Sequence, residues 1–318
     1  TNAQLSLKGV YADQLHTIPG VYMVIHLDQD DGHGGFPITY TFTPPDSKND
    51  QKCKTIELWL KRVSPGTFRM GASQDPASPD YDPRSTGGNV NPESPHQVTI
   101  SKPFFLGVFE VTCKQWELVM GAPPYSGAVS NRAAGSILWN AVRSDPDFAA
   151  FSESSVGHDP TLTTVHADSF AGKLRAKTSN AFLFDLPSEA QWEYACRAGT
   201  TTPLYDGKSY PDVVSLDAAS GLMAAATGSE AGTKNSNPWG FYDMYGNVRE
   251  YVLDLTNNGK LSDAVDPVIS SLDFRPLRGG TGVQADCNRS ASRLSYYGKK
   301  NAGDNRDGFR LAIRYVNE

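Results

Sequence analysis

The stretch from Leu277 to Arg314 decides how the rest of the sequence is interpreted. It begins with Arg278-Gly279-Gly280, continues through Cys287-Asn288-Arg289-Ser290-Ala291-Ser292-Arg293 and closes with Asp307-Gly308-Phe309-Arg310-Leu311-Ala312. Glycines, buriable aromatics and regularly placed arginines indicate that these anchors are fixed by structure. The residues between the anchors follow neither helical nor strand periodicity. Irregular, amphipathic side chains on a fixed frame are typical of a binding surface.

The overall composition predicts a large folded protein. Hydrophobic residues make up 39% of the 318 residues and are distributed along the chain, which is enough for an extensive core. No apolar run in the sequence is long enough for a membrane-spanning helix. The net charge of −6 argues against general nucleic-acid binding, so we expect no nucleic-acid partner. From Arg275 onward, however, nine lysines and arginines stand against four acids, which leaves an anionic partner open at this end.

Four widely spaced cysteines occur, at Cys53, Cys113, Cys196 and Cys287. They form no Cys-x-x-Cys pair and no cluster with histidine, so the pattern does not indicate a zinc site. In a chain of this length we expect buried thiols rather than a framework of disulfides. The sequence starts at Thr1 without a methionine, which suggests that a leader was removed, naturally or by design.

Short β-type runs and long polar loops alternate along the chain. The runs lie at residues 21–27, 38–42, 56–63, 67–71, 98–100, 104–109 and 182–187. The polar stretch Asp75–Pro95, rich in proline and glycine, predicts a long surface loop. We expect residues 1–55 to be an N-terminal elaboration packed on or beside a main domain of residues 56–318.

Few helices are predicted, and two of them have clear start signals. Thr112–Gln115 and Ser188–Gln191 have the form of capping boxes, which open helices. The first helix is expected to run to Met120 and the second to Ala198, with Gly199 as its left-handed stop. Helical spacing also occurs in two further ranges, Val165–Lys177 and Ile137–Val142.

Five sequence motifs, taken together and in order, resemble one known family. They are Pro65–Gly71 (PGTFRMG), Leu186–Ala195 (LPSEAQWEYA), Trp239–Glu250 (WGFYDMYGNVRE), Arg278–Gly280 (RGG) and Gly308–Arg310 (GFR). From about residue 56 to 316 the chain is similar to the formylglycine-generating-enzyme (sulfatase-modifying-factor) family. The resemblance implies an α+β fold of the C-type lectin kind, with few helices and much irregular loop. It does not by itself imply activity, because function depends on sites and not on folds.

The chemistry of that family can be compared with the residues present. Its oxidase activity implies two neighbouring cysteines after the Gly-Gly, where thiolates bind copper and exchange with a substrate thiol. Here residues 280–318 contain Cys287 alone. A second enzymatic branch implies three histidines that bind iron on an added helical domain. Five of the six histidines here, His26, His33, His96, His158 and His166, are scattered through expected loops and strand ends. We therefore expect no catalytic residues and no catalytic cofactor, with an oxidase-like enzyme as the alternative.

A lectin-like scaffold with a varied C-terminal segment also resembles the variable proteins of diversity-generating retroelements. In that class a reverse transcriptase copies a template with errors at adenines, and many residue types result. The frame Arg278–Thr281, Arg289–Arg293 and Asp304–Arg310 fits the class, although Gly282 stands where a tryptophan is usual. The resemblance implies a non-enzymatic, receptor- or adhesin-like surface protein with a variable region at about residues 278–314.

The resemblance and the local pattern together give a set of expected ligand contacts. If residues 288–294 form a strand, Arg289 and Arg293 face inward and the alternate residues face outward. Tyr296 and Tyr297 are expected to contribute most, because amphipathic aromatics dominate binding surfaces, although both could instead pack in the core. The full expected set is Val283, Gln284, Asp286, Asn288, Ser292, Leu294, Ser295, Tyr296, Tyr297 and Asp307.

The resemblance also implies partners and a location. The ligand is expected to be a protein or another cell-surface molecule, and the chain is expected to be a monomer. The class implies an outer-membrane lipoprotein or an otherwise exported protein, with any membrane contact made only through an N-terminal lipid anchor. A carbohydrate-binding lectin is a further alternative, but the Glu-Pro-Asn and Trp-Asn-Asp calcium motifs of lectins are absent.

A structural calcium ion is the one metal that the resemblance implies. Its ligands would be Asp243, Gly246, Val248 and Glu250, the middle two through their carbonyl oxygens, and such hard oxygen ligands suit calcium. The alternative is a bare turn in which Glu250 pairs with an arginine. Arg249, which stands where the family usually has tryptophan, could supply that charge.

Overall fold

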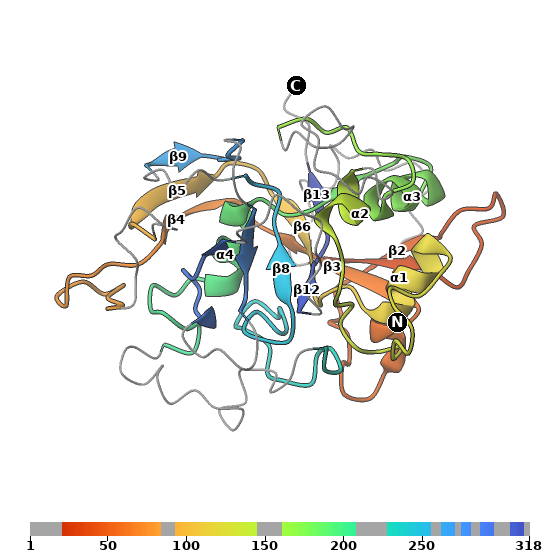
Figure 1. The fold of residues 1–318 in the computed structure, drawn as a ribbon, viewed down its shortest axis with the longest axis horizontal. Coiled ribbons are helices and arrows are strands. Elements are labelled where there is room, and N and C mark those ends of the chain that lie inside the picture. The colour runs from red at the N-terminus through yellow and green to blue at the C-terminus, as the bar shows by residue number, and fades with distance from the viewer. Residues whose placement is uncertain are drawn as a thin grey trace.

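The computed structural model describes residues 21–83, 93–144, 161–207, 228–255, 262–270, 275–280, 287–295 and 306–314. Within these ranges three β-sheets and four α-helices form a mixed α+β structure (Figure 1). The expected fold class is thus confirmed. None of the described helices is both long and apolar enough to cross a membrane.

The largest sheet has six antiparallel strands in the order β2-β1-β3-β6-β13-β7. Their bounds are β1 Tyr22–His26, β2 Ile38–Thr41, β3 Glu57–Val63, β6 Phe104–Gly107, β7 Leu183–Asp185 and β13 Ala312–Arg314. β1 pairs with β3 over its whole length, so the described part of the expected N-terminal elaboration is continuous with the main sheet. β13 lies between β6 and β7, which places the last described strand inside the sheet.

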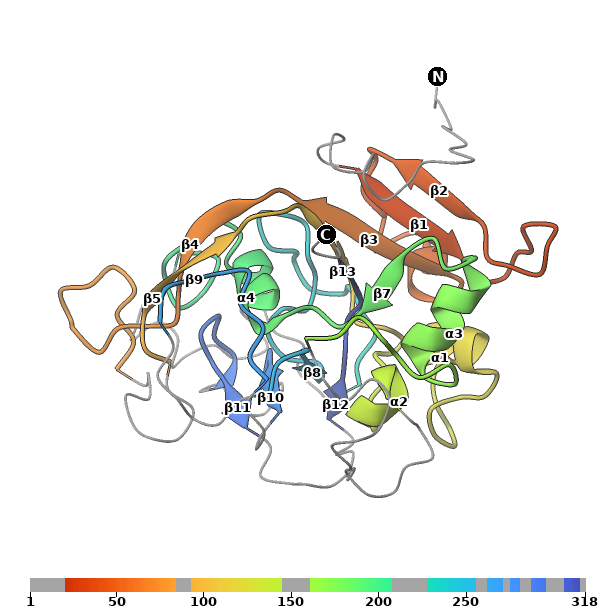
Figure 2. The same cartoon turned by 90° about the horizontal axis from the view of Figure 1, so that it is seen from above.

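Two smaller sheets complete the fold. The four-stranded sheet has the order β11-β10-β8-β12 and the three-stranded sheet the order β4-β5-β9. Their bounds are β4 Gly66–Met70, β5 His96–Ile100, β8 Arg249–Tyr251, β9 Ala264–Val265, β10 Pro276–Arg278, β11 Leu294–Ser295 and β12 Asp307–Gly308. The C-terminal segment therefore supplies β10, β11 and β12, which Figure 2 shows together on one side of the molecule.

Two helices begin at the predicted capping boxes. α1 is Cys113–Met120, and α4 is Glu189–Arg197. In each, the hydroxyl of the N-cap residue accepts from the backbone N–H three residues on, and the glutamine there returns the bond. At the end of α4 the left-handed conformation begins at Ala198 (φ 48°), one residue before the predicted stop at Gly199 (φ 92°).

The other helices are shorter or displaced relative to the sequence prediction. α3 is Phe170–Lys177, because the Ser169 hydroxyl accepts from the Gly172 N–H and starts the helix there rather than at Val165. α2 is Trp139–Arg143, and the 3-10 helix η2 is Gln51–Lys54.

Phe309 connects the C-terminal segment to the larger apolar core, which packs between the main sheet and helices α1 to α3. Its side chain is fully buried. Its ring centroid lies 5.2 Å from that of Phe170 and 6.1 Å from that of Trp116, both edge to face. Edge-to-face contacts of this kind add to the stabilisation that burial gives. The Gly-Phe-Arg motif is therefore an anchor of the fold.

This packing predicts the effect of Phe309→Ala. Removing the Phe309 ring leaves a cavity beside the stacked rings of Trp116 and Phe170 and should lower the free energy of unfolding by about 3–5 kcal/mol. Urea denaturation followed by circular dichroism measures the loss. Phe42→Ala is the control, because Phe42 is 64% exposed and its removal should change stability little. Equal losses for the two variants would contradict the role given to Phe309.

Candidate functional site

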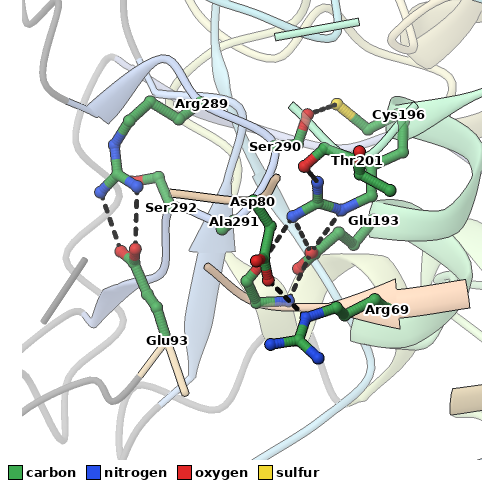
Figure 3. A network of polar contacts seen from close by, with 12 residues as sticks. Arg69, Asp80, Glu93, Glu193, Cys196, Thr201, Arg289, Ser290, Ala291 and Ser292 are labelled. Atoms are coloured by element: carbon green, nitrogen blue, oxygen red, sulfur yellow. Dashed lines mark hydrogen bonds and ion pairs between the residues drawn. The ribbon is translucent and has the colours of Figure 1, made fainter. Parts of the chain in front are cut away.

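Arg289 ties the C-terminal segment to the loop that follows β4. Its guanidinium donates to the two carboxylate oxygens of Glu93 at 2.8 and 2.9 Å (Figure 3). A further bond reaches Asp82 at 3.0 Å, and all three side chains are buried. Asp82 and Glu93 lie within Asp75–Pro95, and the predicted surface position is wrong for both. Each is buried because a buried guanidinium satisfies its charge.

Helix α4 presents two buried glutamates to the same segment. Glu189 and Glu193 lie one turn apart and so share a face of the helix. Glu189 accepts two hydrogen bonds from Arg293, at 2.7 and 2.8 Å. Glu193 pairs with Arg278 and also with Arg197 of its own helix. Two arginines of the C-terminal segment are therefore matched by two acids of one helix.

Arg278 also fixes the backbone of the segment. Its Nη1 donates to the carbonyl oxygens of Ala291 at 3.0 Å and Ser292 at 2.6 Å. Gly280 has a φ of 71°, and a Cβ at this position would collide with the side chain of Asn288. The Arg-Gly-Gly motif thus determines the path of residues 288–292 from the neighbouring strand.

Arg310 makes the fourth pair, with Glu250 of β8. Both carboxylate oxygens accept from the guanidinium at 2.6 Å, and one also accepts from Trp192 Nε1 at 2.7 Å. Burial by itself would lower the pKa of Arg310. The charge and hydrogen bonds of Glu250 outweigh burial and raise the pKa above its ordinary value. Arg310 therefore keeps its charge inside the protein.

The expected outward position of Asn288 and Ser292 is wrong. Both side chains are buried, as are Arg289 and Arg293. The face opposite the arginines is covered too, since the Ser290 hydroxyl bonds the Tyr245 hydroxyl at 2.7 Å. The alternation rule fails here because the chain at residues 287–293 is irregular and enclosed on both sides, rather than a strand with one open face.

The remaining expected contacts divide into two groups. Asp307 is also buried, and it accepts a hydrogen bond from Arg249 Nε at 2.7 Å, so its expected exposure is wrong as well. Leu294 is half-buried in β11. The other positions fall outside the residues whose side chains the structure describes: Val283, Gln284, Asp286, Ser295, Tyr296 and Tyr297.

The residues expected to hold calcium form a buried turn that leads into β8. Asp243, Gly246, Val248 and Glu250 are all buried. Both oxygens of Glu250 face the guanidinium of Arg310, so that carboxylate does not fit a calcium ion. Nowhere in the described ranges do three or more acidic, histidine or cysteine side chains gather to hold a metal. The arginine that pairs with Glu250 is Arg310, whereas Arg249 pairs with Asp307.

A buried carboxylate that sequence analysis missed lies against this turn. Glu110 accepts from Asn247 Nδ2 at 2.6 Å and from the Val248 N–H at 3.1 Å. Burial, and then the charges of Asp243 and Glu250, raise its pKa well above the ordinary value. The sequence signal for this buried carboxylate is that Glu110 is a single acidic residue inside the apolar run Phe104–Val111.

Three of the four cysteine thiols are shielded from solvent. Cys53, Cys113 and Cys196 are buried, and Cys287 is half-buried. Burial raises the pKa of both Cys53 and Cys196 to about 12, and it raises that of Cys113 as well. Cys196 lies 3.7 Å from the Ser290 hydroxyl, beneath the C-terminal segment (Figure 3). Neutral thiols are poor nucleophiles and poor metal ligands.

The buried pair at Arg289 predicts a large effect of Arg289→Met. Two buried carboxylates would lose their partner, which should lower the free energy of unfolding by about 3–5 kcal/mol. The matched control is Lys114→Met, because Lys114 and Glu117 form a partly exposed ion pair whose loss should cost at most about 1 kcal/mol. Chemical denaturation of both variants measures the difference, and similar losses would rule out the anchoring role.

Asp243 predicts a pH-dependent effect of Asp243→Asn. Burial raises the pKa of Asp243 from 3.8 to about 6. A raised folded pKa means that the carboxyl favours the folded state at low pH, and that this contribution is lost as the pH rises through about 6. Asparagine stays neutral and tolerates the φ of 55° at this position. The variant should be more stable above about pH 7, on the order of 2 kcal/mol, and equally stable near pH 4.

Calorimetry with a chelator present measures the melting temperature of both proteins across this pH range. Loss of stability in the variant at high pH would contradict the prediction. A melting temperature that calcium raises in the unmodified protein but not in the variant would indicate a metal at this turn.

Several known proteins share this architecture. The structure of Treponema denticola variable protein 1 superposes with a TM-score of 0.58 and 19% identity, over 82% of this chain and 96% of that one. PvdO from Pseudomonas aeruginosa gives a TM-score of 0.57 and 22% identity, over 81% and 94%. A curated relative, Chaperone protein LppX of Paenibacillus barcinonensis, is 25% identical over 231 residues, which are 66% of this chain and 78% of that protein.

At these identities the two structures establish the fold alone. The first of them is the variable protein TvpA, and the resemblance to it is confirmed for the fold. The family model described as "Sulfatase-modifying factor enzyme 1-like domain" matches residues 47–315, most of the sequence, and the chain belongs to this family.

Proposed function

We propose that this chain is a non-enzymatic ligand-binding protein, receptor- or adhesin-like, whose C-terminal variable region makes the contacts. The main support is the set of buried ion pairs made by Arg278, Arg289, Arg293 and Arg310. Each joins the segment to a carboxylate elsewhere in the fold. The backbone frame is therefore specified by residues other than those assigned to the ligand.

The proposed contacts leave out the expected positions that are buried in the described frame. Leu294 is the member of the set whose side chain is described, and it lies half-buried in β11 at the edge of the four-stranded sheet. Asn288, Ser292 and Asp307 are assigned to the frame, because they are buried within it. The contact set is then Val283, Gln284, Asp286, Leu294, Ser295, Tyr296 and Tyr297.

The thiol chemistry supports a protein without oxidase activity. Cys287 is the single cysteine after Gly280, and the three buried cysteines have raised pKa values. A copper site of two thiolates and a thiol exchange with substrate both need neighbouring reactive cysteines. An oxidase would convert a Cys-x-Pro-x-Arg peptide to an aldehyde, and we expect mass spectrometry to detect no such product.

The proposed setting is the cell surface, with the chain held by an N-terminal lipid anchor or otherwise exported. The proposed ligand is a protein or another cell-surface molecule, and the protein acts as a monomer. The resemblance to retroelement variable proteins supports this setting. A near-copy of the last codons beside a reverse transcriptase gene, differing only at adenines, would establish the retroelement.

A pair of libraries tests the assignment of contacts. The first randomises the seven proposed contact positions, and the second randomises Asn288, Ser292 and Asp307. Members of the first library should mostly fold, with melting temperatures within about 4 °C of the parent. Members of the second should mostly fail to fold, because buried polar groups would lose their partners.

Display of both libraries against immobilised lysozyme, as an arbitrary protein target, then measures binding. The first library should yield binders that the parent does not provide. A first library that is mostly unfolded would mean that the seven positions belong to the core and would overturn the proposal.

A further inference from the structure

A cleft of about 100 Å³ lies where the ends of β5 and β13 meet the start of α4. Figure 1 shows β5, β9 and β13 along the upper side of the molecule. Ile100, Leu253 and Val268 give the cleft an apolar lining, and Lys102 and Arg314 add two cationic side chains. No proposed contact position lines it, so it is a site independent of the variable region.

Arg314 belongs to a cluster of three arginines around the buried carboxylate of Asp185. Arg143 donates to the two oxygens of Asp185 at 3.0 and 3.1 Å. Arg175 and Arg314 lie 3.7 and 3.5 Å from the same carboxylate. Three guanidinium groups therefore share one buried acid. Burial, and to a smaller extent the charge of Arg143, lower the pKa of Arg314 although Asp185 opposes them.

Arg314 lines the cleft, and one nitrogen of its guanidinium group makes its hydrogen bonds to described residues. Its hydrogen bonds to described residues both start at Nη1, to the Leu162 carbonyl oxygen at 2.7 Å and to Asp185 at 3.5 Å. Nε and Nη2 are not engaged by the described residues. Because Arg314 lines the cleft, an anion bound there would add negative charge beside the three guanidinium groups.

We propose that this cleft binds a small organic monocarboxylate. The carboxylate lies between Lys102 and Arg314, and a short aliphatic body packs on Ile100, Leu253 and Val268. An engineered apolar cavity of roughly 150 Å³ holds benzene, so about 100 Å³ suits a carboxylate with two or three further carbons.

The rim disfavours a dianion such as phosphate. Asp266 lines the cleft and is exposed. Its carboxylate is held by the backbone N–H and the hydroxyl of Ser101, which keeps its charge next to the opening. One added negative charge is therefore favoured over two, and the apolar lining leaves a fully hydrated oxyanion without partners on one side.

Calorimetric titration of the purified protein with sodium butyrate at low salt tests the proposal. We expect saturable binding with a dissociation constant on the order of millimolar, given the small number of ligand atoms. The uncharged isostere n-butanol should bind at least about tenfold more weakly, because it cannot pair with either cation. Lys102→Glu should weaken butyrate binding by at least about tenfold, whereas Lys114→Glu, at a half-buried lysine remote from the cleft, should leave it unchanged.

Three results would overturn the proposal. They are the absence of saturable binding up to about 50 mM butyrate, equal affinity in the Lys102→Glu variant, or tighter binding of inorganic phosphate than of butyrate. Lys102 is half-buried and lies outside the helices and strands, so its variant should fold. Circular dichroism checks the fold of the variant. Failure here would leave the proposed function untouched, because the two sites share no assigned residue.

Discussion

The buried arginine–carboxylate pair is the interaction on which this structure depends. Four arginines of the C-terminal segment each find an acid from β8, from α4 or from the loop after β4. Such pairs add little net stability relative to apolar contacts, but an unmatched member is very costly. Their effect is therefore on specificity: a register of the segment that leaves one arginine without its acid is excluded. The backbone of the segment is therefore held at the points where these pairs form.

Membership of a family that includes enzymes does not make the chain an enzyme. The oxidase chemistry of the family depends on two neighbouring, reactive cysteines. Burial raises the pKa of Cys53, Cys113 and Cys196, and the C-terminal segment has one cysteine instead of two. Likewise, both carboxylate oxygens of Glu250, one of the expected calcium ligands, accept hydrogen bonds from Arg310.

Local signals were sufficient for much of the fold. The capping boxes at Thr112 and Ser188 predicted α1 and α4, because a cap involves residues only three apart. Burial of Asp82, Glu93 and Glu110 was not predictable in the same way, since their partners lie far along the chain. The site was predicted least well. Alternation was assumed at Asn288 and Ser292, but the segment there is enclosed on both faces by elements that precede it by many residues.

The place of β13 has a consequence for how the protein is made. This strand lies between β6 and β7, so the main sheet keeps a gap until residues 312–314 have left the ribosome. Whatever the sequence between β10 and β13, the chain must still place β13 between β6 and β7. Because domains fold as units, a substitution in the C-terminal segment that keeps β13 out of the sheet leaves the whole sheet incomplete, rather than damaging one loop.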